Sequence, residues 1–195
     1  MVSKAKVAVL ISGGGTNLQA IIDRWVEGEL PHVDLNLVIS DKKDAYGLKR
    51  AEKANIECVA ITENFEENLL KELEDRSIDI IVLAGFLKIL STKVVNRYNN
   101  RIINVHPALI PSFCGKGYYG IKVHKAALEK GVKISGATVH FVNEIPDGGK
   151  IIMQKAVEVK KDDTAEELQK RIMEEAEWKI LPMALELIAK NLVEE

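Results

Sequence analysis

The most constraining feature of this chain is a short apolar run, residues 7–11, that stops at three consecutive glycines, residues 13–15. A continuous apolar run of this length is typical of a strand that is buried on both faces of a parallel sheet. Residues 17–26 follow, with apolar side chains at the spacing of an amphipathic helix. This beginning predicts a fold in which strands and helices alternate.

The alternation continues through the first half of the chain. Further strands are predicted at residues 33–39, 57–61 and 78–83, and further helices at 44–54 and 66–75. The pattern predicts an α/β fold with an open, mostly parallel, twisted sheet and helices on both faces, as in Rossmann-like proteins. In such sheets ligands bind beyond the carboxyl ends of the strands, where the strand order reverses.

The second half of the chain has a different character. Its predicted elements are a strand at 101–105, a Pro- and Gly-rich loop at 107–120, a helix at 123–129, two long strands at 133–142 and 150–159, and a helical tail at 164–193 that breaks at Pro182. We find no internal repeat and no low-complexity linker, so we expect a single domain over residues 1–195.

Composition narrows the class of partner. The formal net charge is −2, which disfavours binding to nucleic acid. No apolar run approaches the length of a membrane span, and two cysteines, Cys58 and Cys114, make no disulfide framework. The cysteines also lack the spacing of a metal site, so we expect no metal. These features predict a cytoplasmic protein that acts on small molecules.

The glycine loop, residues 12–17, joins the first strand to the first helix. Glycines allow a tight turn and close approach of a ligand, and the helix that follows presents free N–H groups and a positive dipole end. These features predict a phosphate site. The alternative is an ordinary turn with Asn17 as the helix cap. The loop is not a dinucleotide fingerprint, because Leu18 stands where the third glycine belongs.

Two polar side chains, Asn104 and His106, end the strand at 101–105. Residues two apart in a strand share a face, so an amide and an imidazole project together, and Pro107 then stops the strand. Acyl transfer to an amine needs an oxyanion donor and a group that moves protons, which these side chains can supply. A purely structural histidine is the alternative. Asp147 is either part of an Asp-Gly turn or a carboxylate that orients His106.

Four strings in order now resemble a known family. They are residues 10–19 (LISGGGTNLQ), 83–90 (LAGFLKIL), 104–111 (NVHPALIP) and 136–142 (GATVHFV), the last followed by Asp147-Gly148-Gly149. The chain resembles the folate-dependent glycinamide ribonucleotide formyltransferases over about residues 6–182. The resemblance implies that 10-formyltetrahydrofolate is the cosubstrate.

The resemblance also implies roles for individual residues. Asn104, His106 and Asp147 match the catalytic residues of the family. The positions that match ribonucleotide contacts are Gly15, Thr16, Asn17 and Glu177, and those that match the folate pocket are Leu87, Lys88, Ile89, Leu90 and Asn104. His140 and His124 match histidines close to the active site. Without the resemblance, residues 87–90 would pass as the start of a helix, Glu177 as a solvated helix residue and His124 as part of a helix surface.

The chain departs from the family at two loops. Residues 112–120 form a longer loop, and the stretch 62–66 lacks an arginine that often helps to bind ligands; Lys88 or Lys116 could replace its charge. The implied reaction is direct transfer, in which Asn104 and a protonated His106 stabilise the oxyanion and Asp147 supports the charge and relays a proton. The alternatives are a formyltetrahydrofolate hydrolase and a nucleotide-binding module without formyl chemistry. A monomer or a homodimer is expected.

Overall fold

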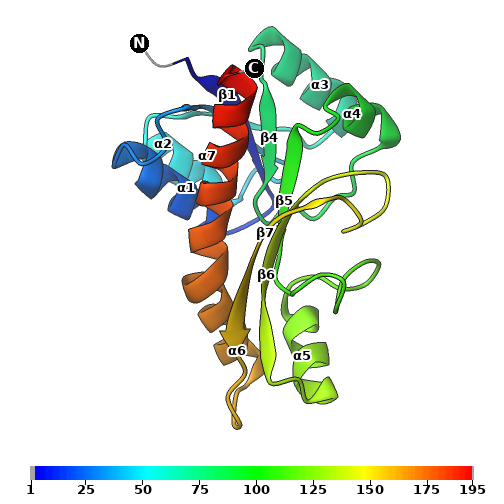
Figure 1. Ribbon diagram of the computed structural model, residues 1–195. Helices are drawn as coiled ribbons and strands as arrows, with labels where there is room; N and C mark the ends of the chain where they lie inside the picture. The colour runs from blue at the N-terminus through cyan, green and yellow to red at the C-terminus, as the bar shows by residue number, and fades with distance from the viewer. Residues whose placement is uncertain (1–2, 195) are drawn as a thin grey trace.

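The computed structural model describes residues 3–194 and shows one seven-stranded sheet flanked by helices (Figure 1). Its elements in chain order are β1 (Ala5–Ile11), α1 (Thr16–Val26), β2 (Val33–Ser40), α2 (Tyr46–Lys53), β3 (Glu57–Ala60), α3 (Phe65–Asp75), β4 (Ile80–Leu83), α4 (Thr92–Arg97), β5 (Ile102–His106), α5 (Ile121–Lys130), β6 (Ile134–Phe141), β7 (Ile151–Glu158), α6 (Ala165–Ile172), η1 (Met173–Glu177) and α7 (Trp178–Glu194).

The strand order is β3-β2-β1-β4-β5-β6-β7. Strands β1 to β5 pair in parallel, whereas β6 and β7 are antiparallel to their neighbours. The order reverses between β1 and β4, so the carboxyl ends of β1, β4 and β5 lie side by side at one edge. This is the position where ligands bind in doubly wound sheets. The predicted open, mostly parallel α/β sheet is confirmed.

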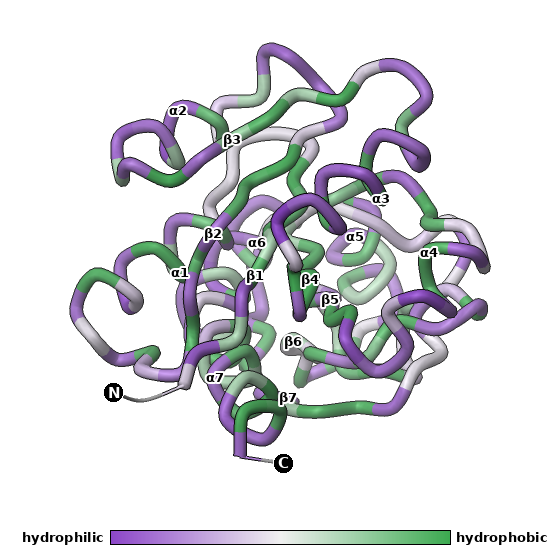
Figure 2. The backbone as a smooth tube through the Cα atoms, turned by 90° about the horizontal axis from the view of Figure 1, so that it is seen from above, coloured by the Kyte–Doolittle hydropathy of each residue, from purple (hydrophilic) through white to green (hydrophobic). Residues whose placement is uncertain are grey.

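Apolar side chains fill both faces of the sheet. In β1, Val7, Val9 and Ile11 face one core, which α1, α2, α6 and α7 cover, and Ala8 and Leu10 face a second core under α3 and α4. Successive residues of a strand point to opposite faces, so the uninterrupted apolar run at residues 7–11 contributes to both cores. Viewed from above, the hydrophobic strands β4 and β5 lie in the middle of the molecule (Figure 2). Helices therefore cover both faces, as predicted.

Several boundaries differ from the prediction. The fourth strand begins at Ile80 rather than at residue 78, and α4 forms where no helix was predicted. The predicted break at Pro182 is wrong, because Pro182 lies inside α7. The irregular turn is instead the π-helical segment η1, which ends at Glu177, five residues before Pro182. Thr164 caps α6 in a capping box with Glu167. Within residues 3–194 no helix is long and apolar enough to span a membrane.

Candidate active site

The candidate site lies where the carboxyl ends of β1, β4 and β5 meet. The backbone of Ser12 donates to the carbonyl oxygen of Gly85 over 3.2 Å, and the Ser12 hydroxyl accepts from the N–H of Leu87 at 3.0 Å. These bonds tie the glycine loop after β1 to the loop after β4. The serine was not singled out in the sequence, although it is the first polar residue after a buried strand.

Asn104 and His106 lie on the same face of β5, as the strand period predicts. Ile103 and Val105 belong to the core on the opposite face. The antiparallel partner of Asn104 is His140 on β6, and the Asn104 amide nitrogen lies 3.1 Å from His140 Nε2. His140 Nδ1 lies 2.8 Å from the Phe141 carbonyl, which can only accept, so Nδ1 carries the proton and Nε2 accepts from the amide.

His106 and Asp147 come together although they are 41 positions apart. His106 Nδ1 lies 3.5 Å from Asp147 Oδ2, and His140 Nε2 lies 3.6 Å from Asp147 Oδ1. The other ring nitrogen of His106, Nε2, lies 2.8 Å from the carbonyl oxygen of Phe113 and therefore donates to it. Both ring nitrogens of this buried histidine thus face protein groups. Phe113 was not predicted, because its contact is made by a backbone atom.

The turn between β6 and β7 holds Asp147 in place. Asp147 has a φ of 56°, and its Oδ2 accepts the N–H of Gly115 at 2.8 Å. Gly149 allows the turn to pass close to β6, since a Cβ there would lie 1.7 Å from the carbonyl oxygen of Phe141. The Asp-Gly-Gly string therefore forms a tight turn and also places a carboxylate beside His106. The two alternatives for Asp147, a turn residue and a partner of His106, thus both describe its position.

Electrostatics set the charges of this pair. Burial lowers the pKa of His106, against the opposing effects of Asp147 and the Phe113 carbonyl. Burial would raise the pKa of Asp147, but the adjacent His140 ring, the hydrogen bond from the Gly115 N–H and the nearby His106 outweigh it and hold this pKa below its usual value. At neutral pH the site therefore contains an ionised carboxylate beside a neutral imidazole.

The glycine loop meets the C-terminal helical segment. Gly15 has a φ of 69° and precedes α1, and Thr16 is the first helical residue. The proposed capping role of Asn17 is wrong, because its side chain forms no cap. Instead the Asn17 amide donates to Glu177 Oε2 at 2.6 Å, and burial raises the pKa of Glu177 to about 7. Glu177 is 6% exposed, so the solvated-helix interpretation is wrong too.

Residues 87–90 form a loop rather than the start of a helix. Leu87 and Ile89 are 60% and 79% exposed, whereas Leu90 is buried in the core under α3 and α4. Lys88 Nζ lies 4.7 Å from the centre of the Phe65 ring. This places its charge beside the stretch 62–66, which lacks an arginine. Leu87 and Ile89 thus offer exposed apolar surface after β4, whereas the Leu90 side chain packs into the core.

His124 is fully buried on α5 rather than part of a helix surface. Neither of its ring nitrogens has a hydrogen-bond partner within residues 3–194. Burial lowers the pKa of His124 to about 4, and the nearby His106 acts in the same direction. His124 is therefore a neutral group close to the site. The peptide bond Ile110–Pro111, in the loop between His106 and His124, is cis.

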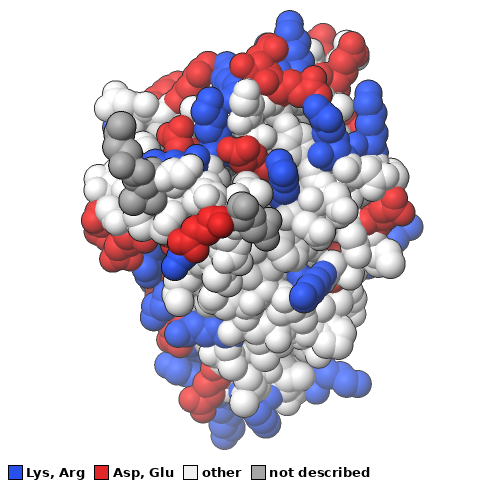
Figure 3. Space-filling model, turned by 45° about the horizontal axis from the view of Figure 1, so that its top comes forward, with Lys and Arg blue, Asp and Glu red and all other residues white. Residues whose placement is uncertain are grey.

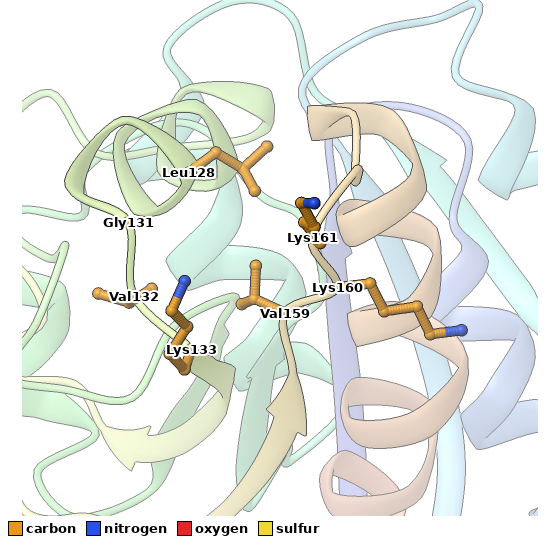
Figure 4. Close-up of a pocket in the computed structure, with 7 residues that line it drawn as sticks. All are labelled: Leu128, Gly131, Val132, Lys133, Val159, Lys160 and Lys161. Atoms are coloured by element: carbon orange, nitrogen blue, oxygen red, sulfur yellow. The ribbon is translucent and has the colours of Figure 1, made fainter.

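A surface hollow outside this site lacks side chains typical of a catalytic centre. A hollow of about 270 Å³ opens beside the start of β6 (Figure 4). It is lined by Leu128, Gly131, Val132, Lys133, Val159, Lys160 and Lys161, with no acid, imidazole or hydroxyl group. Acidic and basic side chains are interspersed on the face shown in Figure 3. Residues 3–194 contain no cluster of three or more side chains suited to a metal ion.

Both the sequence and the fold of this chain are similar to those of known proteins. Residues 5–185 match the formyl transferase family. Phosphoribosylglycinamide formyltransferase of Haemophilus influenzae is 43% identical over 187 residues, which cover 92% of this chain and 85% of that protein. Trifunctional purine biosynthetic protein adenosine-3 of Homo sapiens is 44% identical over 198 residues, 98% of this chain but 19% of that protein. The chain thus spans about a fifth of the human relative.

A solved structure agrees with these matches. Glycinamide ribonucleotide transformylase 1 from Symbiobacterium toebii superposes with a TM-score of 0.89 at 39% identity, covering 96% of this chain and 89% of that one. The resemblance noted in the sequence is confirmed, and the matched region includes every element from β1 to the first half of α7. The chain belongs to the formyl transferase family.

Proposed function

We propose that this protein transfers the formyl group of 10-formyltetrahydrofolate to the amine of glycinamide ribonucleotide. The observation that carries the proposal is the contact between His106 and Asp147, 3.5 Å apart at the carboxyl end of β5, beside a glycine loop and the Asn17–Glu177 pair. A proton-transfer pair, an amide donor and an anion site in one place are the groups that this reaction needs. The names of the relatives support the choice of substrates.

Asn104 stabilises the charge that develops during the reaction. When the amine attacks the formyl carbon, the carbonyl oxygen becomes an oxyanion, which preorganised donors stabilise. The amide of Asn104 has two N–H groups, and His140 Nε2 takes one of them. The second N–H is available for the oxyanion, while His140 keeps the amide in one orientation. In this account His140 positions Asn104.

His106 moves the proton. Because burial lowers its pKa, the ring is neutral before the reaction and accepts the proton that the attacking amine loses. Asp147, ionised at neutral pH, then stabilises the imidazolium, which contributes to stabilising the oxyanion and returns the proton to the departing folate nitrogen. No covalent enzyme intermediate is needed. In this arrangement Nε2 carries the ring proton and donates it to the Phe113 carbonyl. Before Nε2 can accept a proton, the loop at 107–120 must release it and the ring proton must move to Nδ1, which faces Asp147.

Residues on either side of this centre bind the two substrates. The glycine loop, with the N-terminal end of α1, binds the ribonucleotide phosphate. Glu177, whose pKa of about 7 allows it both to donate and to accept, contacts sugar hydroxyls together with Asn17. Leu87 and Ile89 contact the folate ring, and Lys88 supplies a positive charge. A cytoplasmic setting is part of this proposal, in keeping with the unbridged state of both cysteines.

The test is an absorbance assay for tetrahydrofolate. Purified protein is mixed with 10-formyltetrahydrofolate, with and without glycinamide ribonucleotide, and the His106→Ala variant is measured in parallel. We expect turnover only with both substrates and a large loss of kcat in the variant. Tetrahydrofolate release that needs no ribonucleotide would favour the hydrolase. Tight NAD binding without folate binding would favour a nucleotide-binding module.

A further inference from the structure

A residue of α2, Arg50, donates a hydrogen bond to a carbonyl group of the glycine loop. We propose that Arg50 is a positioning residue that fixes the Gly14 carbonyl and thereby aims the backbone N–H groups of the loop at the phosphate of the substrate. The proposal rests on the proposed function, since it concerns the same ribonucleotide site. Arg50 matches none of the motifs in the sequence, and it does not touch the catalytic residues.

The guanidinium of Arg50 has three contacts. Its Nε donates to the carbonyl oxygen of Gly14 at 2.8 Å, and Nη1 donates to Gln19 Oε1 at 2.8 Å. Its central carbon lies 5.0 Å from the centre of the Tyr46 ring. A planar guanidinium that is stacked on one side and bonded at two nitrogens has little freedom to rotate. Arg50 therefore holds the Gly14 carbonyl in one direction.

The backbone of α2 holds the preceding carbonyl. The N–H of Gly47 donates to the carbonyl oxygen of Gly13 at 3.0 Å. The approach is close, because a Cβ on Gly15 would lie 2.7 Å from the Cα of Gly47. The two successive carbonyl groups, of Gly13 and Gly14, are thus both turned toward α2. One is fixed by a backbone group and the other by the Arg50 side chain.

The direction of these carbonyls determines where the N–H groups point. In a trans peptide the C=O and the following N–H point in opposite directions, and the peptide bonds of the glycine loop are trans. The N–H groups of Gly14 and Gly15 therefore face away from α2. Neither donates to an acceptor within residues 3–194, and a Cβ at Gly13 or Gly14 would meet nothing within 4 Å. Free N–H groups that face open space form an anion site.

This geometry separates two possible effects of Arg50. The guanidinium lies on the carbonyl side of the loop, so it acts on the phosphate through Gly14 rather than by contact. Lys49 provides the matched comparison: it carries the same charge on the same helix, its Nζ lies 6.0 Å from the same Tyr46 ring, and none of its contacts reaches the loop. A nonspecific effect of positive charge would depend on both residues equally.

The experiment compares Arg50→Met, Arg50→Lys and Lys49→Met in the formyl transfer assay. For Arg50→Met we expect KM for glycinamide ribonucleotide to rise about tenfold or more, while kcat and KM for the folate stay within about twofold. Arg50→Lys should restore part of the affinity, because an ammonium can still donate to the carbonyl but lacks the second fixed bond. Lys49→Met should match the wild type.

A second readout does not depend on turnover. Inorganic phosphate is titrated calorimetrically into each variant, and we expect binding to weaken in Arg50→Met and to be unchanged in Lys49→Met. If the transfer assay fails in the wild type but this phosphate pattern holds, the proposed function is wrong and the role of Arg50 stands. An unchanged ribonucleotide KM and phosphate affinity in Arg50→Met, an equal effect of Lys49→Met, or a parallel fall in kcat and both affinities would overturn the role.

Discussion

Replacing Asp147 with asparagine separates the charge of this side chain from its shape. The carboxylate faces His106 Nδ1 at 3.5 Å and accepts the Gly115 N–H at 2.8 Å. An amide oxygen can keep the second contact, so the turn should remain folded. The change removes the negative charge beside His106. We therefore expect the pKa of His106, already lowered by burial, to fall further.

The size of the effect follows from the distance. Two unit charges 3.5 Å apart interact with between about 1 and 5 kcal/mol for effective dielectric constants between about 80 and 20. Loss of this attraction makes the protonated ring less favourable, so the pKa of His106 should fall. The imidazolium that forms when the amine attacks loses the same stabilisation. We expect kcat to fall by between about fivefold and about 4,000-fold.

The measurement is an NMR titration of the histidine ring protons, with the signal of His106 assigned from a His106→Asn variant. Turnover is measured on the same samples. Glu144→Gln is the control, because it removes one negative charge from the same turn at an exposed position. A pKa of His106 that stays constant or rises in Asp147→Asn would refute the reasoning, as would an equal shift in the control.

Three further changes test other parts of the structure. Glu177→Gln should raise KM for the ribonucleotide. In thermal melts, the stability of the variant relative to that of the wild type should increase as the pH is raised from 5 to 8. The wild-type carboxyl, with a pKa of about 7 when folded, becomes costly to bury once the unfolded chain ionises. Gly47→Ala places a Cβ 2.3 Å from Ile11 Cδ1, and urea unfolding should show a loss of about 1–3 kcal/mol from overpacking; an unchanged midpoint would count against the close approach. His124→Leu should be at least as stable as the wild type at pH 7 and should lose less stability between pH 6.5 and 4, because the wild-type histidine, with a folded pKa of about 4, disfavours folding as the unfolded chain takes up a proton. Greater pH sensitivity of the leucine variant in chemical denaturation would contradict this.

The sequence predicts the strands of the sheet and the shared face of Asn104 and His106 because both depend on local periodicity. The period of two places Asn104 and His106 on one face, and the apolar runs define the buried strands. The same reasoning misses α4, whose six residues are too short for a clear helical period. It also places the break of the last helix at Pro182, because proline is a familiar helix breaker. The actual irregularity is the π-helical turn at residues 173–177, which has no comparable signal in the sequence.

Contacts between distant segments are harder to predict. Asn17 has the composition of a helix cap, but its bond to Glu177, 160 positions later, depends on how α7 packs on α1. Phe113 meets His106 through a carbonyl group, which any residue could provide. Arg50 looks like an ordinary basic residue on a helix surface until the fold brings it to Gly14. The resemblance to a family suggests roles for single residues but does not predict contacts such as that between Phe113 and His106.

Label transfer tests the central claim most directly. Wild-type protein and His106→Asn are incubated with 10-formyltetrahydrofolate labelled with ¹³C in the formyl group and with glycinamide ribonucleotide, and the products are followed by NMR. The account predicts that the label appears as an amide on the ribonucleotide in equal amount to the tetrahydrofolate released, at a rate that falls steeply in the variant. Label released as formate, or equal transfer by the variant, would contradict it.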